Sequence, residues 1–389
     1  MKHNFDEIIE RRGTDSAKWD LATQDVLPMW VADMDFAAPP PVLAALQARV
    51  HHGVFGYGLA SDRLVNAFLE WQSRRNAWNI DQDTVVVVPG VMPAVKSAIE
   101  EFTDPGDQVV VQPPVYFPFF SSVELAERQL VLNPLLMEGE RYSMDLNGLE
   151  QRFRDGARFL LLCSPHNPVG RVWSRHELSE LARLCSRYDV LVVSDEIHGD
   201  IVYPGSHFTP FGSLEEESGV RSITCASPSK TFNIAGDSVG FTVLSDPQLR
   251  GRFKRRLERA GLHHHSVLDM VAARAAYRDG EEWLGQLLDY LQDNLRFMKT
   301  YLSEHLPDLN PLPVEGTYVQ WLDFRAVMAR LDIDDAELRR RLREDAGVWL
   351  SDGPLFGTGG HGFQRINFAT PRTVLAEGLS RISRTLTSG

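Results

Sequence analysis

The chain has 389 residues, of which 43% are hydrophobic and 24% charged, and its formal net charge is −13. This composition is typical of a globular protein in water, and the length favours one large domain with a smaller one. The negative charge argues against a nucleic-acid surface, which needs a basic stripe to displace counterions. No run approaches the roughly 20 apolar residues of a membrane helix, and the sequence starts without an apolar signal core. We therefore expect a cytoplasmic protein that acts on a small molecule.

From Thr84 to Asp246, short β-branched runs alternate with longer amphipathic ones. Several runs are apolar throughout, as expected for strands of a sheet that is covered on both faces. Ser174 and Glu177 form a capping-box pattern, which predicts a helix that continues to about Tyr188. Together these patterns predict a mostly parallel sheet with crossover helices. The six strands are expected at residues 84–89, 108–113, 158–165, 190–196, 222–227 and 239–246.

Beyond Asp246 the pattern changes. A run that begins near Ser266 carries apolar residues at helical spacing up to Leu302, and it predicts one helix linking the sheet to a second unit. The remainder, with the stretch GTYVQWLDF and a closing helix after Arg372, predicts a smaller α/β domain. We place an N-terminal segment that packs with the small domain at residues 1–45, the large domain at 46–285 and the small domain at 286–389.

Three cysteines and a run of three histidines raise the question of thiol or metal chemistry. Cys163, Cys185 and Cys225 form no CxxC pair and lie in or beside apolar stretches, which favours core positions and a reducing compartment. The adjacent residues His263–His265 would diverge on a helix, and no carboxylate is spaced to complete a ligand set. We expect no metal site and no catalytic thiol, and one of these histidines is a candidate for the lining of a pocket.

Three of the expected strands end in polar residues. Asn167, Asp195 and Lys230 follow the strands at 158–165, 190–196 and 222–227. In open α/β sheets, ligands bind beyond the carboxyl ends of the strands. A buried charge costs several kcal/mol unless it is paired, so an amide, a carboxylate and an amine at one rim indicate a functional site.

The segments around these residues resemble the fold-type I pyridoxal-phosphate enzymes of the aspartate aminotransferase superfamily. The resemblance implies an α/β fold with a mostly parallel seven-stranded sheet and a smaller α/β domain. It extends from about residue 27 to the end and is strongest with the branch of MalY/PatB-type cystathionine β-lyases and other C–S lyases. The motifs that carry it are LPMWVADMDFAAP, FGYG, PGVMPA, QPPVYFPF, SPHNPVG, SDEIH, SPSKTFNIAG, EGTYVQWLDF and RINFATPR.

The resemblance implies a role for each residue at the rim. Lys230 would link covalently to pyridoxal 5′-phosphate and remove the substrate Cα proton, two tasks that need an amine with a lowered pKa. Asp195 would keep the pyridine nitrogen protonated, and Asn167 would donate to the phenolic oxygen. Tyr116 would stack on the pyridine ring.

The phosphate of the cofactor is expected at PGVMPA, where the backbone amides of Gly90, Val91 and Met92 precede a helix. Ser227 would add a hydroxyl. Tyr57 matches the residue that reaches the phosphate of the neighbouring subunit in this superfamily. The resemblance therefore implies a homodimer whose active site is completed by the second chain.

The partner is expected to be a small-molecule substrate, an amino acid. Arg365 would hold its α-carboxylate with a two-pronged hydrogen bond, and Ala32 and Asn167 would complete the contacts. Two positions depart from the aminotransferase pattern: Ser238 stands where an arginine usually holds the phosphate, and His198 stands where a tyrosine is common, close to the cofactor. The histidine is what the C–S lyase branch tends to show.

The fate of the deprotonated substrate decides the reaction class. We favour elimination of a thiolate from Cβ of L-cystathionine, with Lys230 as the base and Tyr116 or Tyr57 assisting proton transfer. Phe117 stands where some C–S lyases have a second tyrosine. The alternatives are an aminotransferase of broad specificity and a regulatory protein that binds the cofactor. The residues do not identify the physiological substrate or the pocket for its distal end, and Asp237 has no physical explanation.

Overall fold

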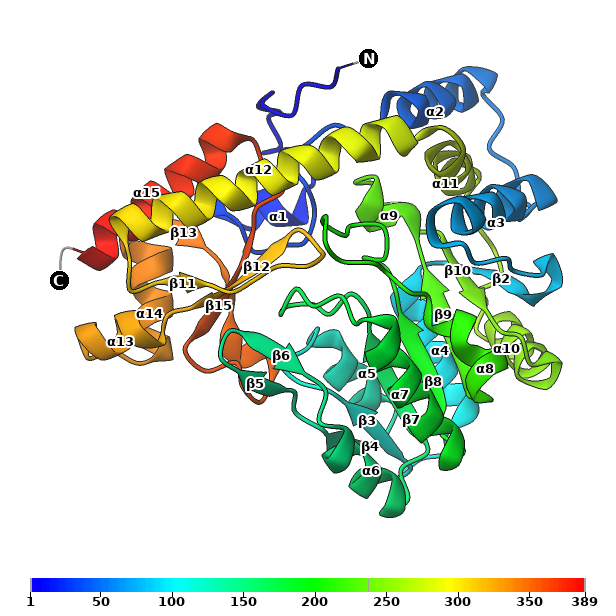
Figure 1. Cartoon of the computed structure of the whole chain (residues 1–389). Helices are drawn as coiled ribbons and strands as arrows, with labels where there is room; N and C mark the ends of the chain where they lie inside the picture. The colour runs from blue at the N-terminus through cyan, green and yellow to red at the C-terminus, as the bar shows by residue number, and fades with distance from the viewer. Residues whose placement is uncertain (1, 237, 388–389) are drawn as a thin grey trace.

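The computed structural model describes residues 2–236 and 238–387. A seven-stranded sheet forms the centre of the large unit (Figure 1). All neighbouring strands are parallel except β10, which is antiparallel to both of its neighbours. The order is β2 (Val85–Val88), β10 (Gly240–Val243), β9 (Arg221–Ala226), β8 (Leu191–Asp195), β7 (Phe159–Cys163), β3 (Gln108–Val111) and β4 (Gln129–Leu132).

The six strands expected from the sequence are confirmed, with ends that shift by no more than three residues. The seventh strand, β4, was not among them. It lies at the edge of the sheet, and its four residues are exposed or half-buried, so it lacks the continuous apolar run of a central strand.

Helices cover both faces of this sheet because successive residues of each strand point to opposite sides. Val109 and Val111 of β3 pack in a core with α4, α5 and α10, whereas Val110 packs in a second core with α6 and α7. Helix α7 begins at the predicted capping box, in which Ser174 and Glu177 satisfy each other's backbone amides. These helices are α4 (Val91–Phe102), α5 (Pro118–Leu125), α6 (Leu146–Arg154), α7 (Arg175–Arg187) and α10 (Pro247–Arg259).

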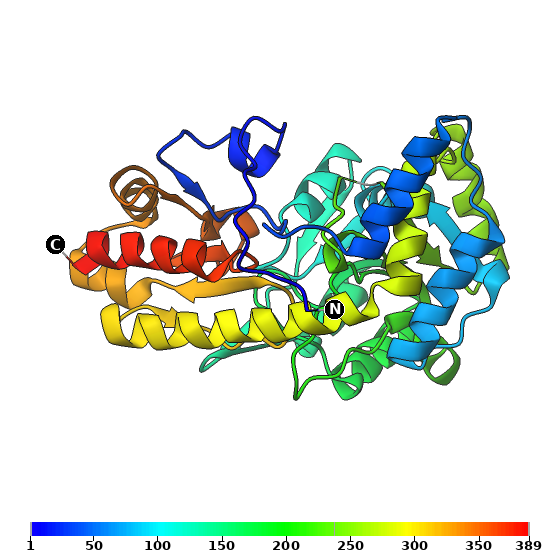
Figure 2. The same cartoon turned by 90° about the horizontal axis from the view of Figure 1, so that it is seen from above.

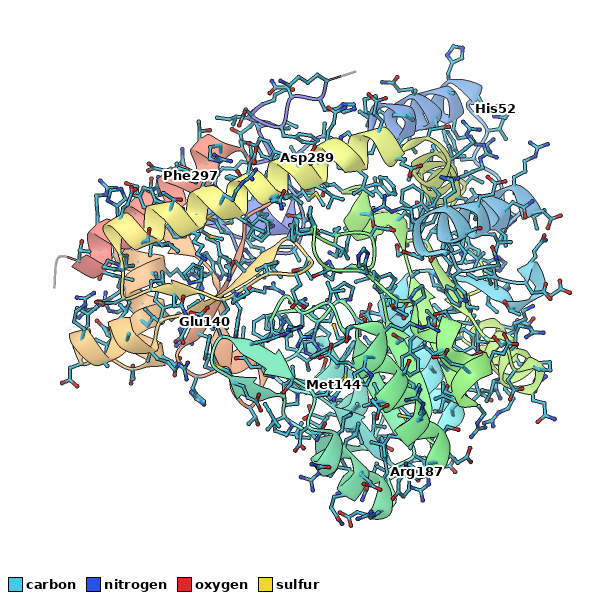
Figure 3. The ribbon with its side chains drawn as sticks, in the orientation of Figure 1. His52, Glu140, Met144, Arg187, Asp289 and Phe297 are labelled. Atoms are coloured by element: carbon cyan, nitrogen blue, oxygen red, sulfur yellow. The ribbon has the colours of Figure 1, made fainter. Side chains whose placement is uncertain are left out.

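The run that starts near Ser266 is two helices, so the expectation of a single one is wrong. Helix α11 (Val267–Asp279) ends at Gly280, where α12 (Glu281–His305) begins. A Cβ at Gly280 would lie 2.4 Å from the Phe232 ring, so the chain passes here only because the residue is glycine. Helix α12 then extends from the large unit along the small one, with Asp289 on its solvent side (Figures 2 and 3).

The small unit is built on a four-stranded antiparallel sheet in the order β11 (Asn310–Pro311), β12 (Val319–Asp323), β15 (Phe363–Asn367) and β14 (Ser351–Asp352). Helix α15 (Arg372–Thr387) packs beside α12 over this sheet (Figures 1 and 2). The N-terminal segment joins the small unit, because β1 (Leu27–Pro28) pairs with β13 (Val348–Trp349). This arrangement carries residues 30–36 across to the rim of the large sheet.

The remaining elements are short or lie at the periphery. Helices α2 and α3 pack against α11. None of the helices in the described residues is both long and apolar enough to cross a membrane. The elements are α1 (Ala17–Asp20), α2 (Pro40–His52), α3 (Asp62–Asn76), α8 (Glu215–Ser218), α9 (Pro228–Thr231), α13 (Arg325–Leu331), α14 (Asp335–Arg340), β5 (Leu136–Glu138) and β6 (Arg141–Ser143).

Candidate active site

Lys230 lies on α9, a single turn that follows β9. The turn starts at Ser227, whose hydroxyl accepts from the Ser229 amide. Thr231 donates to the buried carboxyl of Asp200, so the turn is fixed on both sides of the lysine. The Lys230 amine is buried and donates to the Ala32 carbonyl oxygen at 2.6 Å. The N-terminal segment therefore contacts the reactive amine directly.

Burial lowers the pKa of Lys230 to about 8. The positive charge of Arg365 also lowers it, whereas the negative charges of Asp33 and Asp195 raise it. Desolvation has the largest effect because a charged amine loses its hydration in the protein interior. A substantial fraction of the amine is therefore neutral near physiological pH, as a base or nucleophile requires.

Asp195 ends β8, between Cys163 of β7 and Cys225 of β9. One carboxyl oxygen accepts from the Ile197 amide at 3.1 Å, and the group forms no ion pair with any described residue. Burial raises the pKa of Asp195 to about 6, against the lowering effect of Lys230. A buried carboxylate without a cationic hydrogen-bond partner indicates that a ligand supplies one.

Arg365 lies on β15 of the small unit and faces the rim of the large sheet. Its guanidinium donates to Asn167 Oδ1 at 2.9 Å, to the Trp30 carbonyl at 2.8 Å and to Ser351 Oγ at 3.2 Å. Its Nε is buried without a hydrogen-bond partner. Burial lowers the pKa of Arg365 to about 10, so the group stays charged at neutral pH. It is a fixed cation with unused donor capacity.

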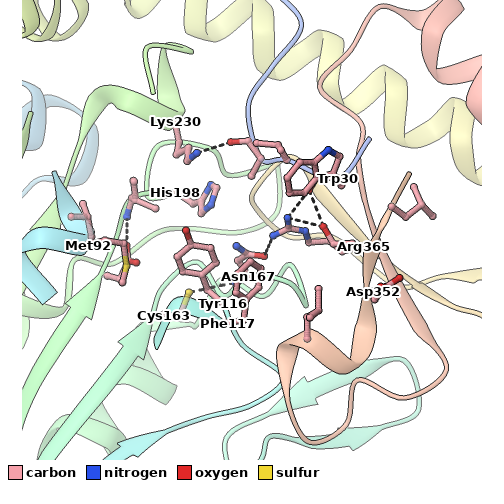
Figure 4. Close-up of a pocket in the computed structure, with 18 of the residues that line it drawn as sticks. Trp30, Met92, Tyr116, Phe117, Cys163, Asn167, His198, Lys230, Asp352 and Arg365 are labelled. Carbon is pink, nitrogen blue, oxygen red and sulfur yellow. Dashed lines mark hydrogen bonds between the residues drawn. The ribbon is translucent and has the colours of Figure 1, made fainter. Parts of the chain in front are cut away.

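These side chains share one cavity of about 350 Å³ between the two units (Figure 4). It contains nine of the predicted site residues: Ala32, Val91, Met92, Tyr116, Asn167, Asp195, His198, Lys230 and Arg365. Phe117 also lines it. The prediction that the ends of three strands converge on one rim is therefore confirmed by the geometry.

His198 and Tyr116 are neutral in this cavity. Burial, with the charges of Lys230 and Arg365, lowers the pKa of His198 to about 3, and its Nδ1 is buried without a partner. Burial raises the pKa of Tyr116, and the nearby charge of Asp195 raises it further. The imidazole is thus a neutral hydrogen-bonding group, and the phenol keeps its proton.

Three predicted residues lie outside the cavity lining. Gly90 precedes α4 with a φ of 108°, a conformation that glycine adopts readily, and so aims the first turn at the cavity. The Ser227 hydroxyl donates to the Val239 carbonyl at 2.7 Å. Tyr57 is 97% exposed and lies in a separate hollow with His264 and His265. The roles of these three residues toward a phosphate remain predictions.

The histidine run and the cysteines take no part in the cavity chemistry. His263–His265 do not line the cavity, and the described residues contain no cluster of three or more metal-ligating side chains. Cys163 borders the cavity, but burial strongly raises its thiol pKa, so it is not a nucleophile. Asp237 lies outside the described residues.

The cavity has further lining residues that the sequence did not identify. Trp30 lies within the motif LPMWVADMDFAAP, so the motif itself was the available signal. Tyr318, in EGTYVQWLDF, lies behind the lining and donates to the same Ala32 carbonyl as Lys230. By contrast, the residues at 343 and 349–352 belong to a stretch without a recognised motif, and only the fold brings them to the cavity.

Comparisons with known proteins agree with this geometry. The family profile described as aminotransferase class I and II matches residues 24–382. The chain is 41% identical to the protein named cystathionine beta-lyase PatB from Bacillus subtilis (strain 168), with 98% of this chain and 100% of that protein aligned.

Two solved structures superpose over the whole of both chains. Cystalysin from Treponema denticola, which contains a pyridoxal 5′-phosphate cofactor, has a TM-score of 0.95 at 34% identity, with 100% of each chain covered. The PLP-bound C–S lyase from Staphylococcus hominis has a TM-score of 0.94 at 30% identity, again with 100% of each chain covered. On the profile match over residues 24–382 and these full-length similarities, the chain belongs to the class I and II aminotransferase family.

Proposed function

We propose that the protein is a pyridoxal 5′-phosphate-dependent carbon–sulfur β-lyase that cleaves L-cystathionine, or a related sulfur amino acid, to a thiol, pyruvate and ammonia. The observation that carries the proposal is the presence of Lys230 and Arg365 in one cavity, where an amine with a lowered pKa lies beside a fixed cation that can bind a carboxylate. The relatives named as a cystathionine β-lyase and a C–S lyase support elimination over transamination.

The residues of the cavity fit this cofactor. The unpaired, buried carboxyl of Asp195 suits a protonated pyridine nitrogen, which is the cationic partner that it lacks. The first turn of α4 offers the amides of Val91 and Met92 to a phosphate. Since Arg365 occupies Asn167 Oδ1, the amide nitrogen of Asn167 is left to donate to the phenolic oxygen. Lys230 supplies the amine for covalent attachment.

When bound, the cofactor supplies an electron sink for the negative charge left at Cα. Lys230 removes the Cα proton, and its lowered pKa makes the neutral base available near neutral pH. Arg365 holds the α-carboxylate and fixes the orientation of the Cα–H bond. Tyr116 keeps its proton and can donate it to the sulfur as the Cβ–S bond breaks. The three-carbon product is then hydrolysed to pyruvate and ammonia.

We also infer that the enzyme is a cytoplasmic homodimer. Phe55, Tyr57 and Leu59 are large apolar or aromatic side chains exposed on one short stretch. Such a patch on a folded chain favours burial against a partner. In the proposed dimer, Tyr57 enters the phosphate end of the neighbouring cavity. Three unpaired cysteines support a reducing compartment.

The purified protein tests the proposal when it is incubated with L-cystathionine and pyridoxal 5′-phosphate but without a 2-oxo acid. We expect homocysteine and pyruvate to accumulate together. An aminotransferase would turn over continuously only when an amino-group acceptor is added, and that result would replace the lyase assignment.

A further inference from the structure

The cavity continues beyond the groups that the proposed reaction uses. Lys230, Asp195 and Arg365 mark the reacting end. The rest of the wall comes from the small unit and the N-terminal segment, and it includes two further charged residues, Arg343 and Asp352. In Figure 4, Asp352 lies on the far side of Arg365 from Lys230. We call Arg343, Asp352 and the indoles of Trp30 and Trp349 the distal wall.

Arg343 is held in place by stacking. Its guanidinium carbon lies 3.8 Å from the centroid of the Trp349 ring. Trp349 in turn stacks on Trp30 with a centroid separation of 4.5 Å and an interplanar angle of 9°. A guanidinium over an indole face is stabilised by cation–π attraction while its N–H groups remain available. The Arg343 side chain forms no ion pair or hydrogen bond with any described residue, so its charge is open to a ligand.

Asp352 provides a negative charge at the same wall. One carboxyl oxygen lies 3.6 Å from Arg339, the other accepts from the Gln364 amide at 3.3 Å, and the side chain is 23% exposed. Arg343 lies near enough for its positive charge to lower the pKa of Asp352, although burial has a larger opposite effect. The distal wall thus presents a cation without an ion-pair partner and a carboxylate that has acceptor sites left beside its contacts with Arg339 and Gln364.

Apolar groups line the same cavity. Phe117, Leu350 and Leu355 line the cavity along with the charged residues, and Phe117 and Leu355 are 38% and 52% exposed. Such surfaces suit methylene and thioether groups, which make no hydrogen bonds. The cavity therefore combines a carboxylate clamp, apolar surface and a second pair of charged residues.

We propose that Arg343 and Asp352 recognise the distal end of the substrate, and that this end is a second α-amino acid group. Arg343 binds its carboxylate and Asp352 its ammonium. This inference rests on the proposed lyase function and names the leaving group, a thiol that is itself a zwitterionic amino acid. A substrate with only one distal charge leaves the other wall residue unpaired, so the wall selects against it.

Four substrates of the holoenzyme separate the two contacts. L-Cystathionine carries both distal charges, S-(3-carboxypropyl)-L-cysteine lacks the ammonium, S-(3-aminopropyl)-L-cysteine lacks the carboxylate, and S-methyl-L-cysteine lacks both. Pyruvate formation gives kcat/KM for each substrate with the wild type, Arg343→Gln and Asp352→Asn. Arg296→Gln is the control, because Arg296 is 70% exposed and does not line the cavity.

We expect Arg343→Gln to lower kcat/KM for L-cystathionine roughly tenfold to a hundredfold, the loss typical of a hydrogen bond to a charged group, chiefly through KM. The same variant should change the aminopropyl substrate less than about threefold, because its partner carboxylate is absent. Asp352→Asn should show the reverse pattern, with the carboxypropyl substrate spared. Arg343→Lys should recover part of the loss, since it keeps the charge.

The turnover of S-methyl-L-cysteine shows that each variant is folded and active, so a general defect cannot imitate the pattern. Equal losses on all four substrates, or no loss on L-cystathionine, would overturn the distal assignment while leaving the lyase function intact. If the wild type forms pyruvate from none of the four, the proposed function fails and the inference fails with it.

Discussion

In the cofactor-free protein, the burial of ionised Asp195 lowers the free energy of unfolding. Burial raises its pKa from 3.8 to about 6, so between these values the folded state binds more protons than the unfolded state. The free energy of unfolding therefore falls as the pH rises through this window, and above it the cost is about 3 kcal/mol, from about two pKa units. The cationic nitrogen that Asp195 would bind offsets this destabilisation.

Asp195→Asn should accordingly stabilise the cofactor-free protein at pH 7, by up to about 3 kcal/mol, because a neutral amide has no charge to desolvate. The difference from the wild type should vanish toward pH 4. The same variant should bind pyridoxal 5′-phosphate more weakly. Thermal unfolding between pH 4 and 8, with Asp289→Asn on the exposed side of α12 as control, measures the first effect. A variant that is less stable than the wild type at pH 7 contradicts this account.

At the scale of elements, residues 30–36 connect the two charged ends of the reaction site. The Ala32 carbonyl accepts from Lys230, and the Trp30 carbonyl accepts from Arg365. Asn367 of β15 holds the segment, since its Nδ2 donates to the carbonyls of residues 31 and 33 at 2.7 and 2.5 Å. Asn233, just beyond α9, bonds the backbone of residues 34 and 36. The position of residues 30–36 thus depends on two side-chain amides, that of Asn367 in the small unit and that of Asn233 in the large unit.

Asn367→Ala should lower the free energy of unfolding by about 1–3 kcal/mol, because it removes the donor to the part-buried Val31 carbonyl and the acceptor for the buried Ala369 amide. Displacement of the segment should raise KM more than it lowers kcat, since Arg365 loses its alignment while Lys230 is still present. Urea unfolding and steady-state kinetics check both effects. The control is Asn147→Ala, at an exposed position of α6. Identical behaviour of the two variants would rule out a positioning role for Asn367.

At the scale of the whole molecule, the sequence predicted the parts with strong local signals. Continuous apolar runs marked the buried strands, and the ends of those strands located Asn167, Asp195 and Lys230 at one rim. The break at Gly280 was missed because helical spacing continues on both sides of it, and the close approach of the Phe232 ring is a tertiary contact. The distal wall was missed for the same reason: Trp30 and Trp349 meet only through the pairing of β1 with β13.

Tyr57 cannot serve the cavity of its own chain, since it is 97% exposed and lies in a separate hollow. If it completes the neighbouring site, dimers of Tyr57→Phe and Lys230→Ala chains contain one site with both defects and one with neither. Mixing the two inactive or weakened variants should then restore up to about half of the activity per mixed dimer. Additive activities without any gain on mixing, for chains shown to exchange, would place Tyr57 outside the active site.

The most direct test of the central proposal is the stoichiometry of products from L-cystathionine in the absence of any 2-oxo acid. We predict equal amounts of pyruvate, ammonia and homocysteine over many turnovers, and none from Lys230→Ala, which lacks the base that removes the Cα proton. The contrary result is that no thiol is released and that turnover begins only when a 2-oxo acid is added. It would show that the deprotonated substrate is reprotonated instead of losing its thiolate from Cβ, and it would contradict the lyase assignment.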